Sequence, residues 1–328
     1  MEQQANQRIE FIDLTKGLCI MLVVMMHVGG VFDSLATGPI LSSFTMPLYF
    51  FVSGLFFKSY EGFAGFLARK ADKLLVPFLI FYLGAFLLMY GISKAVPGTF
   101  RLPVRWSELL LVFQGHELIR FNPPIWFLIA LFNCNILFYL VHYLRRKHIP
   151  TMFAVTLLVG ATGFWLGKQR IELPFYFAGF WIRRYNFFLY PHHRFDKLIP
   201  LFILLALVTM YFTATPLGMR TNNYPGNFIQ VYLAAFAGIF AIMLLCKKVK
   251  KAPVISYLGR FSIITLGIHG PLLFFFRPLV SRFLHNEWMQ SIVLLAVTLG
   301  VCLLLTPLIV RLIPQFVAQK NLLKRPSK

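Results

Sequence analysis

The chain has 328 residues, of which 58% are hydrophobic and 13% are charged, and its mean hydropathy is +0.72. Soluble domains carry about 25% charged and about 45–50% apolar residues, so this composition excludes a soluble globular fold. The net charge of +21 would suit a nucleic-acid-binding protein, but the cations form short clusters between apolar stretches, as membrane proteins arrange them. We therefore predict a polytopic membrane protein with no nucleic-acid partner.

Apolar segments long enough to span a bilayer recur along the whole chain. A transmembrane helix needs about 20 mainly apolar residues, and this criterion predicts an all-α helix bundle of about ten spans. They are 11–31, 41–58, 74–92, 124–143, 151–167, 173–190, 198–214, 227–246, 255–277 and 288–313.

The distribution of Lys and Arg predicts the orientation of the bundle. If the N-terminus is cytoplasmic, 23 of the 32 Lys and Arg residues fall on the cytoplasmic side. The positive-inside rule then predicts that both termini are cytoplasmic. We expect one integral-membrane domain over 1–328, with short cytoplasmic tails at 1–10 and 314–328.

The first predicted helix carries an acid, a cation and an imidazole on one face. Lys16 precedes His27 by eleven positions, and eleven steps of about 100° bring the two side chains to within about 20° of each other. They stand about 16 Å apart along the helix axis, and Asp13 lies near the same face. Ionisable groups inside a membrane are costly, so this stripe predicts a functional site. The alternative is that Lys16 snorkels to the interface and His27 bonds a neighbouring helix.

Two further segments with chemical interest follow in the chain. In 46–54 (MPLYFFVSG) a Pro, aromatic residues and then Ser53 with a Gly predict a kinked helix with a point of close approach. Three cations, Arg69, Lys70 and Lys73, then precede the third predicted span. Cations at a helix N-terminus favour a phosphorylated ligand, because backbone N–H groups and the helix dipole add to them. A positive-inside anchor explains the same cluster equally well.

The later spans carry a Trp at an outer end and a second intramembrane imidazole. Trp126 opens the fourth span, where a residue of the interfacial aromatic belt is the ordinary explanation. Ser262 and His269 are seven residues apart in the ninth span and therefore share a helix face. The four cysteines occur singly in apolar stretches, which favours neither a disulfide framework nor a metal site.

Taken in order, these segments resemble acyltransferase family 3, the integral-membrane O-acyltransferases of bacterial surface sugars, and in particular its fucose 4-O-acetylase type. The first helix, RIEFIDLTKGLCIMLVVMMHV, is similar to the family's opening, where an Arg-x10-His pattern appears here as Lys16 and His27. MPLYFFVSGLFF is similar to a Pro-aromatic-Ser-Gly segment, and RKADKLLVPF to a basic run before Pro. IWFL and LGRFSIITLGIH resemble the family's later Trp-Phe-Leu and Ser-to-His segments. The similarity extends from residue 8 to about 275.

The resemblance implies a membrane enzyme with a soluble donor and a sugar acceptor. The donor is acetyl-CoA or a similar acyl-CoA from the cytoplasm, with no permanently bound cofactor. The acceptor is a hydroxyl of a surface polysaccharide or a lipid-linked sugar, and the location is the bacterial inner membrane. Lys16, Arg69, Lys70 and Lys73 would hold the CoA phosphates, and the thioester arm would extend along the first helix.

The resemblance also implies roles for individual residues near the acyl group. His27 would act as general base on the acceptor hydroxyl, since a neutral imidazole has a suitable pKa near about 6.5. Asp13, Lys16 and His269 complete the expected catalytic group, and an acetyl-histidine relay through His27 is the competing mechanism. The expected acceptor contacts are Ser53, Trp126 and Ser262.

Two rival functions from other classes stay open at this point. One is a transporter or flippase that moves a glycan or lipid-linked sugar without acyl transfer. Coupled transporters commonly use intramembrane carboxylates, and no predicted span carries an Asp or Glu at mid-membrane, which disfavours a coupled transporter. The other is a structural assembly partner of a polysaccharide synthase.

Overall fold

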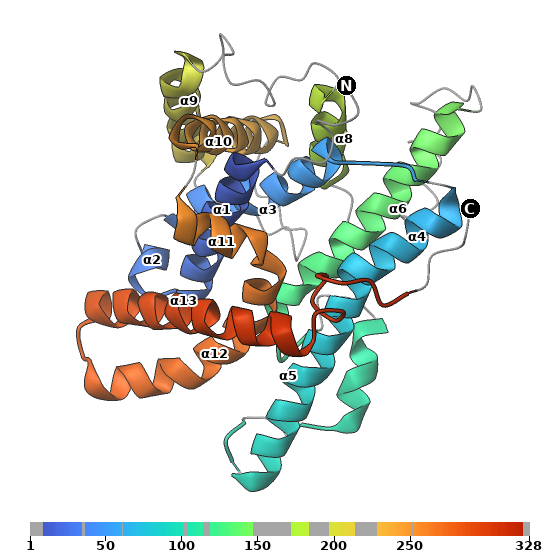
Figure 1. Ribbon diagram of the computed structural model, residues 1–328. Coiled ribbons are helices and arrows are strands. Elements are labelled where there is room, and N and C mark those ends of the chain that lie inside the picture. Colours follow the sequence, from blue (N-terminus) through green and yellow to red (C-terminus); the bar gives the residue numbers. More distant parts are fainter. Residues whose placement is uncertain are drawn as a thin grey trace.

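The computed structural model describes residues 9–34, 37–60, 62–96, 98–100, 104–113, 119–146, 172–183, 197–213, 228–250 and 252–323. Every regular element within these ranges is a helix, which confirms the predicted all-α class (Figure 1). The α-helices are α1 (Glu10–Val28), α2 (Val31–Ser34), α3 (Thr37–Leu55), α4 (Phe63–Lys70), α5 (Val76–Ala95), α6 (Trp126–Arg146), α8 (Glu172–Arg183), α9 (Ile199–Thr213), α10 (Phe228–Val249), α11 (Pro253–Arg260), α12 (Ser262–Phe283) and α13 (Glu287–Leu312). The π-helical segment η2 (Ala71–Leu75) and the 3₁₀ segments η3 (Trp106–Phe113) and η5 (Pro123–Ile125) complete the set.

Six helical stretches in the described residues are long and apolar enough to cross a membrane, so the protein is a multi-pass membrane protein. They are Glu10–Val28, Phe63–Ala95, Pro123–Arg146, Gln230–Val249, Ser262–Phe283 and Glu287–Leu312. α3, α8 and α9 correspond to three further predicted spans, although α8 has only 12 residues and α9 has 15. The predicted span 151–167 lies outside the described residues.

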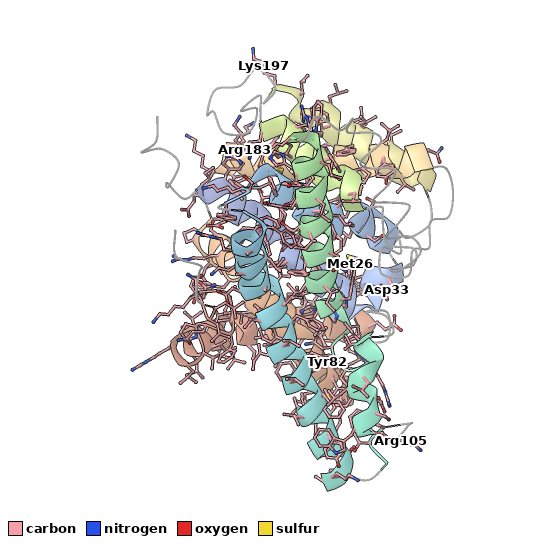
Figure 2. All side chains as sticks on the ribbon, turned by 90° about the vertical axis from the view of Figure 1, so that its right-hand side faces the viewer. Met26, Asp33, Tyr82, Arg105, Arg183 and Lys197 are labelled. Atoms are coloured by element: carbon pink, nitrogen blue, oxygen red, sulfur yellow. The ribbon has the colours of Figure 1, made fainter. Side chains whose placement is uncertain are left out.

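Three side chains from segments predicted for opposite sides of the membrane lie at opposite ends of the molecule. Arg183 and Lys197, which the Lys and Arg distribution assigns to the cytoplasm, lie near one end, whereas Arg105 lies at the other (Figure 2). Tyr82 lies between them, towards the Arg105 end. This arrangement agrees with a membrane-crossing bundle, and the direction in which the bundle is inserted stays a prediction.

α1 is the central helix, because α3, α10, α11 and α12 all pack against it. Its backbone contacts that of α11 directly at Gly17 and Gly259, where a Cβ atom on either glycine would collide with the backbone of the facing helix. Glycines permit such close approach of helices within a bilayer. Lys16 and Arg260 are the chain neighbours of these glycines, so the contact brings the two cations to the same part of the bundle.

α3 and α8 make a second close backbone contact. Gly54 of α3 and Gly179 of α8 face each other's backbones, and a Cβ at either position would collide with the facing main chain. Pro47 lies inside α3, about two turns before this contact. The predicted Pro-containing helix with a close-approach glycine is therefore confirmed.

The cations of 69–73 do not stand at a helix N-terminus, and that prediction was wrong. α4, η2 and α5 form one continuous helical rod from Phe63 to Ala95, beside α6 (Figure 1). The charged residues suggested a loop before the helix. The helical rod instead begins at Phe63, about two turns before these cations, directly after Gly62, whose φ is 97°. The wide π-helical turn η2 lies next to Pro77, which has no N–H to donate to the carbonyl of Lys73.

The ninth predicted span is two helices rather than one. α11 ends at Arg260, Phe261 leaves the helical conformation with φ −112° and ψ 26°, and α12 begins at Ser262. Phe261 is buried in a small apolar cluster with Ile264 and Val317, while Gly259 holds α11 against α1. The chain therefore bends between these two contacts, and α12 then pairs with α13.

Residues 314–323, here named the C-terminal strap, fold back across the rod of α4, η2 and α5 (Figure 1). The backbone N–H groups of Leu322 and Leu323 donate hydrogen bonds of 3.0–3.2 Å to the carboxylate of Asp72. The ammonium of Lys73 donates to the carbonyl oxygen of Ala318 at 2.5 Å. The segment that the sequence assigned to a tail is thus fixed to η2 by two consecutive side chains.

Candidate functional site

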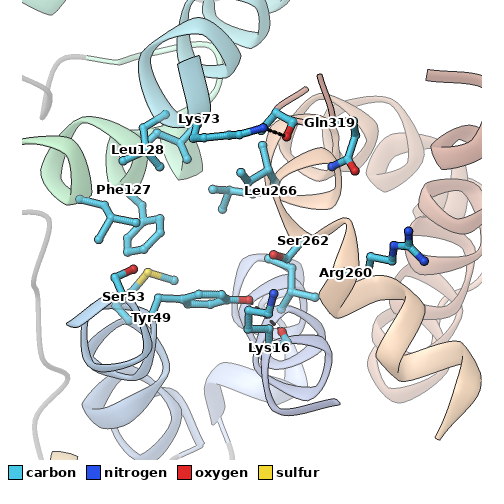
Figure 3. A pocket seen from close by; sticks show the side chains of 16 residues that line it. Lys16, Tyr49, Ser53, Lys73, Phe127, Leu128, Arg260, Ser262, Leu266 and Gln319 are labelled. Carbon is cyan, nitrogen blue, oxygen red and sulfur yellow. Dashed lines mark hydrogen bonds between the residues drawn. The ribbon is translucent and has the colours of Figure 1, made fainter. Parts of the chain in front are cut away.

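The basic residues of α1, η2 and α11 meet around a cavity of about 310 Å³. Lys16, Lys73 and Arg260 line it, together with the hydroxyl-bearing side chains of Tyr49, Ser53 and Ser262 and an apolar majority. Lys16 and Lys73 lie on opposite sides of this space (Figure 3). The helices that carry these residues are far apart in the sequence, and α1 joins them because both α3 and α11 pack on it.

A second, smaller cavity of about 170 Å³ adjoins the first. The two share four lining residues, Ser53, Lys73, Leu74 and Leu131. The smaller cavity adds Tyr60, Arg69, Lys70, Asn135 and Asn321. Five cations therefore line the pair of cavities, which we call the basic chamber: Lys16, Arg69, Lys70, Lys73 and Arg260.

Each side chain of the basic chamber is held by a specific contact. Lys16 forms an ion pair of 2.9 Å with Asp13, and its carbonyl oxygen accepts a hydrogen bond of 2.9 Å from the Tyr49 hydroxyl. The Arg69 guanidinium lies 4.2 Å from the centre of the Tyr60 ring. Five cations face two nearby carboxylates, Asp13 and Asp72, so the chamber keeps an excess of positive charge.

The two intramembrane imidazoles form a pair. The rings of His27 on α1 and His269 on α12 lie with centroids 5.1 Å apart in an edge-to-face arrangement. His269 is fully buried and His27 is exposed. Nothing in the sequence spacing required this contact, since 242 positions of chain separate the two residues and only the packing of α12 on α1 joins them.

Hydrogen bonds fix the tautomer of both rings. Nδ1 of His27 lies 2.8 Å from the carbonyl oxygen of Val23, and Nδ1 of His269 lies 2.8 Å from that of Thr265. A carbonyl oxygen only accepts, so Nδ1 carries the hydrogen in each ring and Nε2 of the neutral ring carries the lone pair. In each ring, Nε2 is therefore the atom that can accept a proton.

Arg277 of α12 holds the end of α1 that carries His27. Its Nη2 donates hydrogen bonds of 2.9 Å and 3.1 Å to the carbonyl oxygens of His27 and Val28. These carbonyls end α1 and lack intrahelical donors, and a cation is stabilised at a helix C-terminus. The contact fixes α1 to α12 beside the imidazole pair.

The imidazole pair lies beyond the inner end of the basic chamber along both helices. Ile20 of α1 and Leu266 of α12 line the chamber. His27 follows Ile20 by seven residues, or about 10 Å, and His269 follows Leu266 by three, or about 5 Å. One helix thus carries the chamber cation Lys16 and the imidazole of His27 about 16 Å apart.

A family model described as an acyltransferase domain, that of acyltransferase family 3, matches residues 9–307, nearly the whole chain. The chain belongs to acyltransferase family 3. No curated protein and no solved structure matches it. The protein is therefore a membrane acyltransferase. The family match supports neither of the rival assignments, a transporter and an assembly partner.

In this acyltransferase, most of the site residues predicted from the sequence lie in two groups. Lys16, Ser53, Lys73 and Ser262 line the larger cavity. Arg69 and Lys70 line the smaller one, Asp13 pairs with Lys16, and His27 contacts His269.

The position of Trp126 differs from both expectations drawn from the sequence, an interfacial belt residue and an acceptor contact. The residue is 6% exposed and belongs to the main apolar core, so it is not a residue of an interfacial belt. Its neighbours Phe127 and Leu128 line the larger cavity, whereas Trp126 does not. The 3₁₀ turn η5 precedes α6 and directs Trp126, the first residue of that helix, towards the protein core. The hydrophobic periodicity of the sequence does not reveal this direction.

Several residues of the acyltransferase site were not predicted. Tyr49 lies within MPLYFFVSGLFF and Arg260 within LGRFSIITLGIH, two of the segments that carry the family resemblance, and this position is the signal that marks them. Asn321 and Gln319 lie in the C-terminal strap, which has neither a motif nor a periodic pattern. Only the tertiary fold brings that segment to the site.

Proposed function

We propose that the enzyme transfers a short acyl group, acetyl in the simplest case, from cytoplasmic acyl-CoA to a hydroxyl of a cell-surface glycan or lipid-linked sugar in the bacterial inner membrane. The observation that carries this proposal is the basic chamber, in which five cations surround adjoining cavities, with an imidazole pair farther along α1 and α12. The acceptor class rests on the resemblance of five motifs to those of glycan O-acyltransferases.

The basic chamber suits the chemistry of a CoA donor. CoA carries several phosphate groups on one end and a long, mostly neutral thioester arm on the other. Arg69, Lys70 and Lys73 give the smaller cavity the charge that phosphates require, and Arg contributes paired N–H donors. The larger cavity is mainly apolar and extends along α1, which suits the neutral arm.

The imidazole pair suits the chemistry of hydroxyl acylation. Nε2 of His27 takes the proton of the acceptor hydroxyl, and the oxygen attacks the thioester carbonyl carbon. The carbon–sulfur bond then breaks, and the CoA thiolate takes the proton back from the imidazolium, which leaves an ester and free CoA. In the competing relay, Nε2 itself attacks the thioester first and passes the acyl group to the hydroxyl.

The test is acyl transfer by the purified protein reconstituted into closed lipid vesicles, in which glycan movement across the bilayer can also be measured. Acetyl-CoA labelled in its acetyl group is incubated with lipid-linked oligosaccharides and polysaccharide fragments, and label in the glycan is measured. We expect transfer by the wild type, almost none by His27→Gln, and normal transfer by His285→Gln, an exposed histidine outside the site. Absence of label from every glycan, together with glycan movement across the bilayer, would contradict the proposal.

A further inference from the structure

The helix that carries His269 contains a carbonyl that its own backbone does not satisfy. In an α-helix the carbonyl of residue i accepts from the N–H of residue i+4. Gly267 would accept from residue 271, but this residue is Pro271, which has no N–H. The carbonyl of Gly267 therefore needs a donor from elsewhere, and a buried carbonyl without one is costly.

Asn122 supplies that donor from a different part of the chain. Its Nδ2 donates a hydrogen bond of 2.7 Å to the carbonyl oxygen of Gly267, and Asn122 is 1% exposed. Gly270 permits the approach, since a Cβ there would lie 2.9 Å from Oδ1 of Asn122. The side chain thus lies against the turn of α12 that contains His269.

Asn122 does not serve the local role that its position suggests. An Asn before a helix normally caps it with its side chain. The turn η5 that follows opens with Pro123 and Pro124, which have no N–H, and Ile125 N–H donates to the backbone carbonyl of Asn122. The Asn122 side chain makes no cap bond to η5 and instead donates its hydrogen bond to α12.

We propose that Asn122 is a positioning residue for catalysis: by replacing the hydrogen bond that Pro271 removes, it fixes the α12 turn that sets His269 against His27. This inference rests on one part of the proposed function, namely that the imidazole pair takes part in catalysis. Nε2 of His269 is buried and has no hydrogen-bond partner among the described residues, so the backbone of its turn holds the ring through Thr265. A shift of that turn moves the ring relative to His27.

The sharpest test uses Pro271 itself. In Pro271→Ala the backbone N–H of residue 271 returns, and it can donate to Gly267 within the helix. Asn122→Ala alone should lower kcat by about 10-fold to about 100-fold with a donor KM within about twofold of wild type, since small misplacements cost rate. Asn122→Ala combined with Pro271→Ala should recover most of that loss. Asn122→Ala combined with Pro278→Ala, a proline of the same helix, should not.

A second measurement does not depend on catalysis. Diethyl pyrocarbonate modifies exposed imidazoles, and mass spectrometry reports the rate at each histidine. His269 should react slowly in the wild type, faster in Asn122→Ala, and slowly again when Pro271→Ala is added. This measurement decides the inference even if the wild type transfers no acyl group, an outcome that would overturn the proposed function alone.

Two results would overturn the role of Asn122. One is an Asn122→Ala variant with wild-type kcat and wild-type His269 reactivity. The other is a loss that Pro271→Ala leaves unchanged in both measurements. Asn135→Ala serves as the matched control, because Asn135 is also buried and donates to a carbonyl, that of Leu131, yet lies on α6. Pro271→Ala should leave any defect of Asn135→Ala as it is.

Discussion

At the scale of single residues, the imidazole pair is the feature on which the proposed catalysis depends. His27 and His269 contact each other edge to face, and Nδ1 of each ring donates a hydrogen bond to a backbone carbonyl of its own helix. A protonated His27 beside a neutral His269 keeps both Nδ1 bonds, so proton uptake at Nε2 needs no rearrangement of the rings. This is the behaviour that a general base requires.

The first prediction is that His27→Gln nearly abolishes transfer. Removal of a general base typically lowers the rate by about 10²-fold to 10⁴-fold, and Gln keeps hydrogen bonding without accepting the proton. The measurement is kcat with saturating donor and acceptor, beside a thermal melt that checks folding. A variant that retains most activity would mean that His27 only packs, and His269 would then be the candidate general base.

The second prediction concerns the donor phosphates. Lys70→Ala together with Lys73→Ala should raise the KM for acyl-CoA about tenfold or more and change kcat less, because a hydrogen bond to a charged group contributes about 1.5–3 kcal/mol. Lys94→Ala, a cation near the far end of the same helical rod, is the control and should leave KM unchanged. An unchanged KM in the double variant would make the cluster a positive-inside anchor.

At the scale of elements, the glycine contact between α1 and α11 brings Lys16 and Arg260 to one cavity. The third prediction is that Gly259→Ala destabilises the protein by about 1–3 kcal/mol, since an added methyl group in a close-packed contact forces the helices apart. Gly300→Ala is the matched control, because a Cβ there meets nothing within 4 Å. Thermal unfolding in detergent should separate the two variants, and equal melting temperatures would contradict the close contact.

The fourth prediction concerns the C-terminal strap. Asp72→Ala removes the acceptor for the Leu322 and Leu323 N–H groups, so the strap should leave the basic chamber. Limited proteolysis followed by mass spectrometry should then cleave within 314–323 faster than in the wild type, and the donor KM should rise severalfold. Asp33→Ala, an exposed acid on α2, should change neither quantity. Wild-type cleavage in Asp72→Ala would show that the strap is held by other contacts.

At the scale of the whole molecule, the fifth prediction fixes the direction of insertion. All four native cysteines are buried and reduced, so they give little background with a membrane-impermeant maleimide. A cysteine placed at Arg105 should react in intact cells, and one at Lys58 only after the cells are opened; both positions are exposed. Reaction at position 58 in intact cells would reverse the orientation and with it the route of the donor.

The sequence was sufficient for the class of fold and for four of the five cations that line the basic chamber. Hydrophobic length predicted the spans, and the rarity of ionisable groups in them made Lys16, His27 and His269 conspicuous. The π-helical turn beside Pro77 and the inward Trp126 after η5 could not be predicted, because hydrophobic periodicity does not report such local turns. The bend at Phe261 could not be predicted either, because it depends on α1 and on Val317, which are far away in the chain. The same reason hides Asn122, whose partner carbonyl lies 145 positions away.

The C-terminal strap also sets a time order on the appearance of activity. α1 and the basic run leave the ribosome long before residues 314–323 do, so the nascent chain in the membrane has an open chamber whose Lys73 lacks its Ala318 contact. The wall formed by Ala318, Gln319 and Asn321 is added only when synthesis has passed these residues. We therefore expect the proposed donor site to be complete, and acyl transfer to begin, only after α13 is in place.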